Sequence, residues 1–167
     1  NIKPMSVINE SRDTTHYSIV DSEGNAVSNT YTLGYSFGSG VTIPGTGILM
    51  NNQMNNFAYR YGDSSVDGRA ASPANRFEAG KRPMSTMTPT MVFNQAGELM
   101  LVTGSPGGSF IPAAVLRVVS GVIDFDLNIG EATMLPRIHK DWPYSGLDHE
   151  SILSSDIARQ LGIMGHK

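Results

Sequence analysis

Two stretches of β-favouring side chains near the start of the chain predict a hairpin. Residues 14–20 and 26–33 are rich in Thr, Tyr, Val and Ile, and the polar segment Asp21–Asn25 between them is typical of a turn. Symmetry about the middle of this turn would set Thr14 opposite Thr32, so that two hydroxyl groups meet where the first strand begins. A bulge at Gly24 could shift the register by one residue. Taken alone, this pairing is that of an ordinary Thr–Thr contact between strands.

A second hairpin and a long helix are predicted further along the chain. Residues 88–93 and 98–103 flank a turn at 94–97, and Gly104-Ser-Pro-Gly-Gly-Ser109 follows directly. Apolar side chains then recur at helical spacing from Ile111 to Ile123. Free N–H groups at such a helix start favour negative charge, and two consecutive glycines let a reacting oxygen approach the backbone. Without further evidence the glycine-rich segment is a tight turn.

Shorter elements are predicted elsewhere. Ile48–Met50 is expected to be a short buried strand. Asn128 and Glu131 have the spacing of a capping box, which predicts a short helix that Pro136 ends. Residues 155–164 are expected to form a last amphipathic helix.

Three segments lack periodicity and predict loops. Residues 1–13 are expected to be a linker, and residues 58–82 a long surface loop of the kind that often acts as a lid. Residues 51–56 contain four Asn and one Gln. Such a run is by default a solvated loop, although amides that line a pocket also orient polar ligands.

Composition narrows the classes of function. A chain of 167 residues can form one domain with a core, and its 18 Gly and 9 Pro favour many turns and short strands. The net charge of −3 with 16% charged residues provides no basic stripe, so no nucleic acid partner is expected. No apolar run approaches the roughly 18 residues of a membrane span. With no Cys and four His that lack ligand spacing, we expect neither a metal nor another cofactor. A first residue of Asn suggests a fragment or a processed product.

Six ordered motifs between about residue 14 and about residue 139 resemble the small catalytic subunit of gamma-glutamyltranspeptidases. The motifs are Thr14-Thr-His-Tyr-Ser18, Asn25-Ala-Val-Ser28, Thr30-Tyr-Thr-Leu33, Gly47-Ile-Leu-Met-Asn-Asn-Gln-Met54, Lys81-Arg-Pro-Met-Ser85 with Met87-Thr-Pro-Thr90, and Thr103-Gly-Ser-Pro-Gly-Gly108. The resemblance implies an α+β fold, the small-subunit half of the four-layer αββα sandwich of N-terminal-nucleophile hydrolases. The other half would be a large subunit cut from the same precursor. Residues 1–13 would then be the pre-cleavage linker that ends the large-subunit region, and residues 14–167 a small-subunit domain that stops short of the family's final strands.

The same resemblance implies catalytic roles for individual residues. Thr14 matches the nucleophile, which first cleaves the Asp13–Thr14 bond of an inactive zymogen by autoproteolysis. It then attacks the γ-carbonyl of the donor, with its freed amine as the base. Thr32 matches a threonine that hydrogen-bonds the nucleophile. Gly107 and Gly108 match the donors of the oxyanion hole.

Substrate-binding positions show both matches and departures. Gln53, Ser85 and Thr86 match positions that hold the α-amino and α-carboxylate groups of the glutamyl donor, with Thr86 where serine is usual. Gly34 stands where the family usually has asparagine, and Asn56 where it usually has an aspartate that pairs with the α-ammonium group. Charge-assisted hydrogen bonds are roughly twice as strong as neutral ones, so the loss of the carboxylate weakens that contact. Family members that act as cephalosporin acylases resemble this chain at Asn56.

The resemblance therefore predicts a gamma-glutamyltransferase and glutathione hydrolase that acts in glutathione metabolism. It would cleave the γ-glutamyl amide of glutathione or related compounds through a threonyl acyl-enzyme, with an amino acid, a peptide or water as the acceptor. One alternative is a glutaryl or cephalosporin-type acylase of the same family. A different class is an inactive fragment or a homologue that binds small peptides. The resemblance also implies a periplasmic or secreted location, and the isolated chain is expected to stay uncleaved and inactive.

Overall fold

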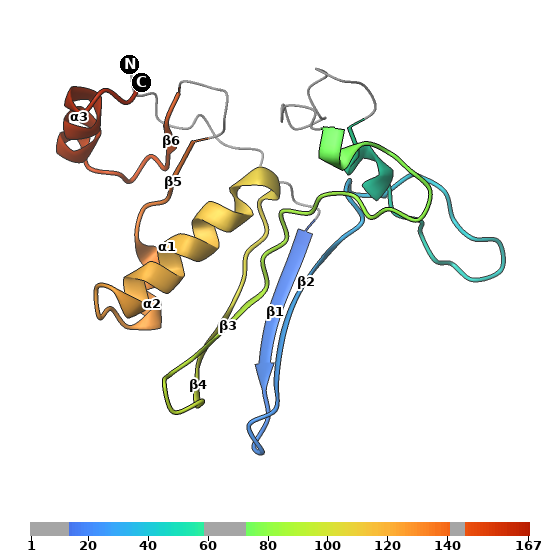
Figure 1. Ribbon diagram of the computed structural model, residues 1–167, viewed down its shortest axis with the longest axis horizontal. Coiled ribbons are helices and arrows are strands. Elements are labelled where there is room, and N and C mark those ends of the chain that lie inside the picture. Colours follow the sequence, from blue (N-terminus) through green and yellow to red (C-terminus); the bar gives the residue numbers. More distant parts are fainter. Residues whose placement is uncertain (1–13, 59–72, 141–145) are drawn as a thin grey trace. The chain divides into compact units, whose positions relative to one another are not determined.

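The computed structural model describes residues 14–58, 73–140 and 146–167. The predicted linker and most of the predicted lid loop therefore lie outside the described residues. Two compact units adjoin in sequence between Ile111 and Pro112. Helices and two-stranded antiparallel sheets occur together, in keeping with the predicted α+β class (Figure 1). Among the described residues, no helix combines the length and the apolar character needed to cross a membrane.

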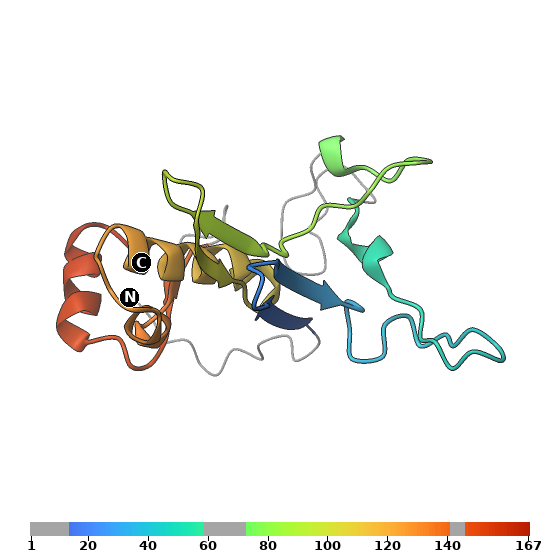
Figure 2. The same cartoon turned by 90° about the horizontal axis from the view of Figure 1, so that it is seen from below.

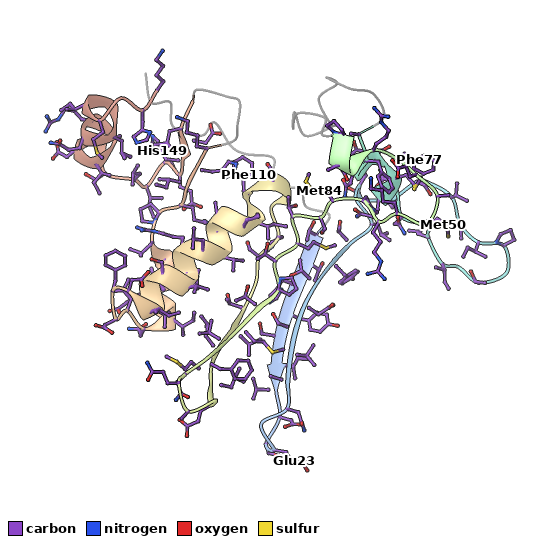
Figure 3. The ribbon with its side chains drawn as sticks, in the orientation of Figure 1. Glu23, Met50, Phe77, Met84, Phe110 and His149 are labelled. Carbon is purple, nitrogen blue, oxygen red and sulfur yellow. The ribbon has the colours of Figure 1, made fainter. Side chains whose placement is uncertain are left out.

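The first hairpin has the predicted register. β1 (Thr14–Val20) and β2 (Ala26–Thr32) pair antiparallel, and Thr14 is the direct partner of Thr32. The pairing runs to the turn without a shift, so the possible bulge at Gly24 does not occur. Asp21 Oδ1 accepts the backbone N–H groups of the residues two and four positions on, both at 2.9 Å. This Asx arrangement closes the turn, with Glu23 at its tip, and holds the register (Figure 3).

The second hairpin is shorter than predicted. β3 (Thr90–Phe93) and β4 (Leu99–Thr103) pair antiparallel, with an irregularity between Val92 and Phe93. The predicted start at Thr88 is wrong, because Pro89 has no N–H to give to a ladder and restricts the residue before it. β4 contacts both strands of the first hairpin, and the two hairpins lie side by side in Figures 1 and 2.

The prediction of a short buried strand at Ile48–Met50 is wrong. Leu49 makes a single bridge to Thr42, while Ile48 is 57% and Met50 is 42% exposed. Gly45 and Gly47 both adopt positive φ and fold this segment back after a few hydrogen bonds. The hydrogen-bonded ladder therefore ends too early to form a strand. The apolar character of residues 48–50 is not enough by itself to bury them.

The unit from Pro112 onward is helical. It holds α1 (Ile111–Ile123), α2 (Ile129–Met134), α3 (Ser155–Ile163) and the short pair β5 (Ile138–His139) and β6 (Asp148–His149). The predicted capping box is confirmed, because Asn128 and Glu131 exchange two bonds of 3.0 Å. Gly121 lets α2 approach α1, since a Cβ there would lie 3.0 Å from Ala132 Cβ.

Candidate active site

Thr14 and Thr32 lie together at the open end of the first hairpin. Thr14 is the first residue of β1, Thr32 is the last of β2, and both are half-buried. The backbone N–H of Gly34 donates to Thr32 Oγ1 at 2.9 Å, and Gln53 Nε2 donates to the Thr32 carbonyl at 3.4 Å. Thr32 is thus held from the following turn and from the amide-rich segment, directly across from Thr14.

The predicted glycine turn uses the conformational freedom of both glycines. Gly107 has φ 131° and is buried, and Gly108 has φ 57°. A side chain at either position would be strained. The turn passes through the 3₁₀ helix η3 (Gly108–Phe110) straight into α1, and the N–H groups of Phe110 and Ile111 donate to the carbonyls of Gly107 and Gly108.

Contacts between β1 and the end of β4 indicate where this turn lies. Ser18 Oγ donates to the Val102 carbonyl at 3.2 Å, and the ring of His16 lies against Gly104. Between these two contacts the position on β1 falls from residue 18 to residue 16, while the position on the other segment rises from residue 102 to residue 104. The two segments therefore run in opposite directions. Residues 102–104 thus run beside β1 toward the end of the hairpin that carries Thr14 and Thr32, and the glycine turn follows β4 directly in the chain.

The amide-rich run is an ordered turn rather than a loose loop. Residues Gln53–Asn56 form the 3₁₀ helix η1, in which Asn56 Nδ2 donates to Gln53 Oε1. The next side chain, Phe57, is 2% exposed and packs edge-on against Phe77, with ring centroids 5.4 Å apart (Figure 3). This packing anchors η1 and with it the neutral amide pair Gln53–Asn56. Gln53 in turn connects the pair to the Thr32 carbonyl.

Gly34 faces a residue that the sequence did not single out. Its φ is +94°, and a Cβ at this position would lie 1.8 Å from Asn52 Oδ1 and 3.6 Å from Gln53 Nε2. The Asn52 backbone N–H donates to the Leu33 carbonyl at 2.9 Å, which keeps Asn52 beside this turn. The side-chain amide of Asn52 thus fills the space that a side chain at position 34 would occupy. The glycine in place of the family's asparagine was the signal that could have indicated it.

Ser85 and Thr86 are connected to the amide cluster indirectly. Ser85 Oγ accepts the Met87 N–H at 3.1 Å. Asn75 joins this segment to η1, because its Oδ1 accepts the Met84 N–H at 2.9 Å and its Nδ2 donates to the Asn56 carbonyl at 2.6 Å. The structure thus connects this segment to Asn56 through Asn75, and Gln53 connects η1 to the Thr32 carbonyl.

His16 is a second residue that the sequence left unused. It lies on the same face of β1 as Thr14, and its burial lowers the pKa of its ring from the ordinary value. Among the described residues, no cluster of three or more His, Cys, Asp or Glu is placed to hold a metal ion.

Two threonines paired at the start of a strand and a glycine turn with positive φ are groups that a threonine nucleophile and an oxyanion hole would require. The gamma-glutamyltranspeptidase family model matches residues 1–167, and the chain belongs to this family.

Three similar proteins illustrate the match. A glutathione hydrolase proenzyme of Escherichia coli is 46% identical over 158 residues, which cover 95% of this chain and 27% of the relative. A mutant gamma-glutamyltranspeptidase of Helicobacter pylori superposes with a TM-score of 0.86 at 44% identity, over 92% of this chain and 82% of that one. A cephalosporin acylase of Bacillus halodurans gives a TM-score of 0.73 at 31% identity, over 91% of this chain and 26% of that one. The predicted α+β fold of an N-terminal-nucleophile hydrolase is confirmed. The chain spans less than a third of the length of the curated relatives it matches first.

Proposed function

We propose that this chain supplies the nucleophile and the oxyanion donors of an enzyme that cleaves γ-glutamyl amides such as glutathione. One observation carries the proposal. Thr14 begins a strand opposite Thr32, at the end of the hairpin toward which the Gly107–Gly108 turn is directed. A nucleophile, a hydroxyl neighbour and backbone N–H donors are the groups that acyl transfer needs.

The proposed reaction uses the Thr14 hydroxyl twice. In the precursor it attacks the carbonyl carbon of Asp13, which lies outside the described residues. The Asp13–Thr14 peptide bond breaks as an ester forms, and hydrolysis of this ester leaves the Thr14 amine free. In the mature enzyme this amine takes the hydroxyl proton as the oxygen attacks the γ-carbonyl of the donor. The N–H groups of Gly107 and Gly108 would stabilise the oxyanion, and removal of one such donor typically costs about 2.7–4 kcal/mol.

Breakdown of the tetrahedral intermediate completes each half-reaction. The amine passes its proton to the leaving nitrogen, the amide bond breaks, and a threonyl ester remains. Water, an amino acid or a peptide then attacks the ester and gives its proton to the amine. The ester bond breaks, and the amine passes this proton to Thr14 Oγ, which regenerates the hydroxyl. Thr32, as the cross-strand partner of Thr14, would orient the nucleophile.

The donor site favours a second candidate for the acyl group. The Gln53–Asn56 amide pair and the amide of Asn52 offer dipoles, where a carboxylate would offer a full charge to an α-ammonium group. A glutaryl group has no such ammonium and loses nothing here. We therefore propose a narrow preference for γ-glutamyl over glutaryl donors, with a glutaryl or cephalosporin-type acylase as the alternative.

The remaining proposals concern the assembly. The proenzyme form of the relatives supports a large subunit from the same precursor as the partner of this chain. A periplasmic or secreted location rests on the family resemblance described above.

An activity assay tests the proposed function. The precursor that contains this chain is purified and given γ-glutamyl and glutaryl p-nitroanilides, with Thr14→Ala as the inactive reference. We expect release of nitroaniline from the γ-glutamyl donor by the parent alone, and a smaller but measurable release from the glutaryl donor. Faster turnover of the glutaryl donor would favour the acylase. Absence of turnover with either donor would favour the non-catalytic homologue.

A further inference from the structure

The imidazole of His16 connects three strands through a directed chain of hydrogen bonds. Its Nδ1 lies 2.7 Å from Thr30 Oγ1 on β2, and its Nε2 lies 3.0 Å from Ser18 Oγ on β1. Ser18 Oγ donates to the carbonyl of Val102 on β4 at 3.2 Å. These contacts tie the nucleophile hairpin to the strand that leads into the glycine turn.

The direction of each bond follows from its acceptor. Because Ser18 uses its hydroxyl proton on the Val102 carbonyl, it must accept from His16 Nε2–H. In the neutral ring Nδ1 then carries no proton and accepts from the hydroxyl of Thr30, a residue that is 8% exposed. Burial lowers the pKa of the ring, which favours this neutral form with its proton on Nε2.

Gly104 completes the contact on the side of the turn. A Cβ at this position would lie 2.2 Å from two atoms of the His16 ring and 2.8 Å from a third. Its backbone is not in the left-handed region, so the close approach of the ring is what excludes a side chain. A parallel bond from Ser28 Oγ to the Thr103 carbonyl, at 3.0 Å, holds the preceding residue to β2.

The surroundings of the ring are polar without being charged. Among the described residues, the groups that contact the His16 ring are the Thr30 and Ser18 hydroxyls and the backbone at Gly104, and none of these three carries a charge. A neutral ring satisfies these contacts.

We propose that His16 is a positioning residue that fixes the Gly107–Gly108 turn at the level of Thr14. The ring sets the distance between β1 and the backbone of Gly104, three residues before the first proposed oxyanion donor. This inference rests on the proposed function. A displaced oxyanion hole leaves donor binding by the amide cluster intact, so its loss falls on kcat, whereas KM stays near its parent value.

A double-mutant cycle tests the inference in the precursor that contains this chain, with rates normalised to the processed fraction. Gly104→Ala should lower kcat for γ-glutamyl p-nitroanilide by about 10–100-fold, because the new methyl group pushes the turn away from β1. His16→Ala should lower kcat by about tenfold, because the spacing is lost. The double variant should be no slower than His16→Ala, since removal of the ring makes room for the methyl group.

Two further variants keep the test decisive. Gly146→Ala is the matched glycine control, because its Cβ would meet only the Lys167 carbonyl at 3.9 Å, and it should retain the parent kcat. Thr30→Val removes the donor to Nδ1 at constant shape and should lower kcat by about threefold, which is the loss of one hydrogen bond of modest strength. It remains informative if Gly104→Ala is not processed.

Two kinetic results would overturn the inference: a parent-like kcat in both Gly104→Ala and Thr30→Val, or a double variant that is slower than His16→Ala. A fall in thermal stability with unchanged kcat would also contradict it, because it would assign His16 a structural role alone. Failure of the parent itself to turn over the anilide would instead overturn the proposed function, and this inference with it.

Discussion

The side-chain amide of Asn52 occupies the space that a side chain at position 34 would need. A Cβ on Gly34 would lie 1.8 Å from Asn52 Oδ1, and the backbone there has φ +94°. The N–H of the same glycine donates to Thr32 Oγ1 at 2.9 Å. A change at position 34 therefore acts both on Asn52 and on the threonine opposite the nucleophile.

We therefore expect that the asparagine usual in the family at position 34 cannot replace Gly34 without a loss of activity. Gly34→Asn should lower kcat/KM for the γ-glutamyl anilide by about tenfold, because it displaces Asn52 and strains the backbone. Addition of Asn52→Ala should recover part of the loss by freeing the space. Steady-state kinetics of the parent, the single variants and the double variant check this. A Gly34→Asn variant with parent-like kcat/KM would show that Asn52 does not fill this space.

Donor selectivity should depend on the charge at position 56. Asn56→Asp should shift the ratio of kcat/KM for γ-glutamyl and glutaryl anilides toward the glutamyl donor by about tenfold, as a neutral contact becomes charge-assisted. Asn55→Asp is the matched control, because it adds the same charge one residue away, and it should shift the ratio less. An unchanged ratio in Asn56→Asp would contradict the assignment of Asn56 to the donor site.

Acid should weaken the folded chain through His16. Burial lowers the pKa of the ring from its ordinary value of 6.5 in the folded state. The unfolded chain therefore binds a proton that the folded chain does not, and the stabilisation is present above pH 6.5 and is lost as the pH falls toward the lower folded value. The fall in the free energy of unfolding between pH 7 and 5 should be smaller in His16→Gln than in the parent. Equal pH dependence, measured by chemical denaturation, would show that the ring titrates normally.

The capping box of α2 gives a prediction about stability alone. Asn128→Ala removes the acceptor of the Glu131 N–H and should cost about 1 kcal/mol, with a lower Tm. Asn128→Ser keeps a capping hydroxyl and should stay close to the parent. Thermal unfolding followed by circular dichroism checks this, and an Asn128→Ala variant as stable as the parent would show that the cap is dispensable.

Local signals made much of this fold predictable from the sequence. Symmetry about the Asp21–Asn25 turn predicted the Thr14–Thr32 pairing, and the Asx bonds of the structure explain why the possible one-residue shift does not occur. The capping box and the apolar period of α1 are likewise local. The six ordered motifs carried the resemblance to the family, and that resemblance indicated the candidate site residues.

Other features depend on segments far apart in the sequence. Whether the apolar residues at 48–50 become buried depends on what covers them, and in the described residues Ile48 is 57% exposed. The approach of His16 to Gly104 and of Asn52 to Gly34 arises from packing between such segments. Neither periodicity nor spacing in the sequence predicts a contact of this kind. The sequence alone therefore did not single out His16 or Asn52.

The central claim is that Thr14 becomes the acylated nucleophile of a processed enzyme. In the precursor, Thr14→Ala should abolish cleavage before residue 14 and turnover of the anilide, while Thr32→Ala should weaken turnover partially. Thr15→Ala is the matched control, because its exposed side chain points to the opposite face of β1, and it should be processed and active.

Mass spectrometry of the acid-quenched enzyme during turnover of the γ-glutamyl anilide tests this assignment of Thr14. We expect a small chain that begins at Thr14 and carries one γ-glutamyl group on its first residue. A γ-glutamyl group on another residue, or turnover at the parent rate by a Thr14→Ala protein that remains uncleaved, would contradict it.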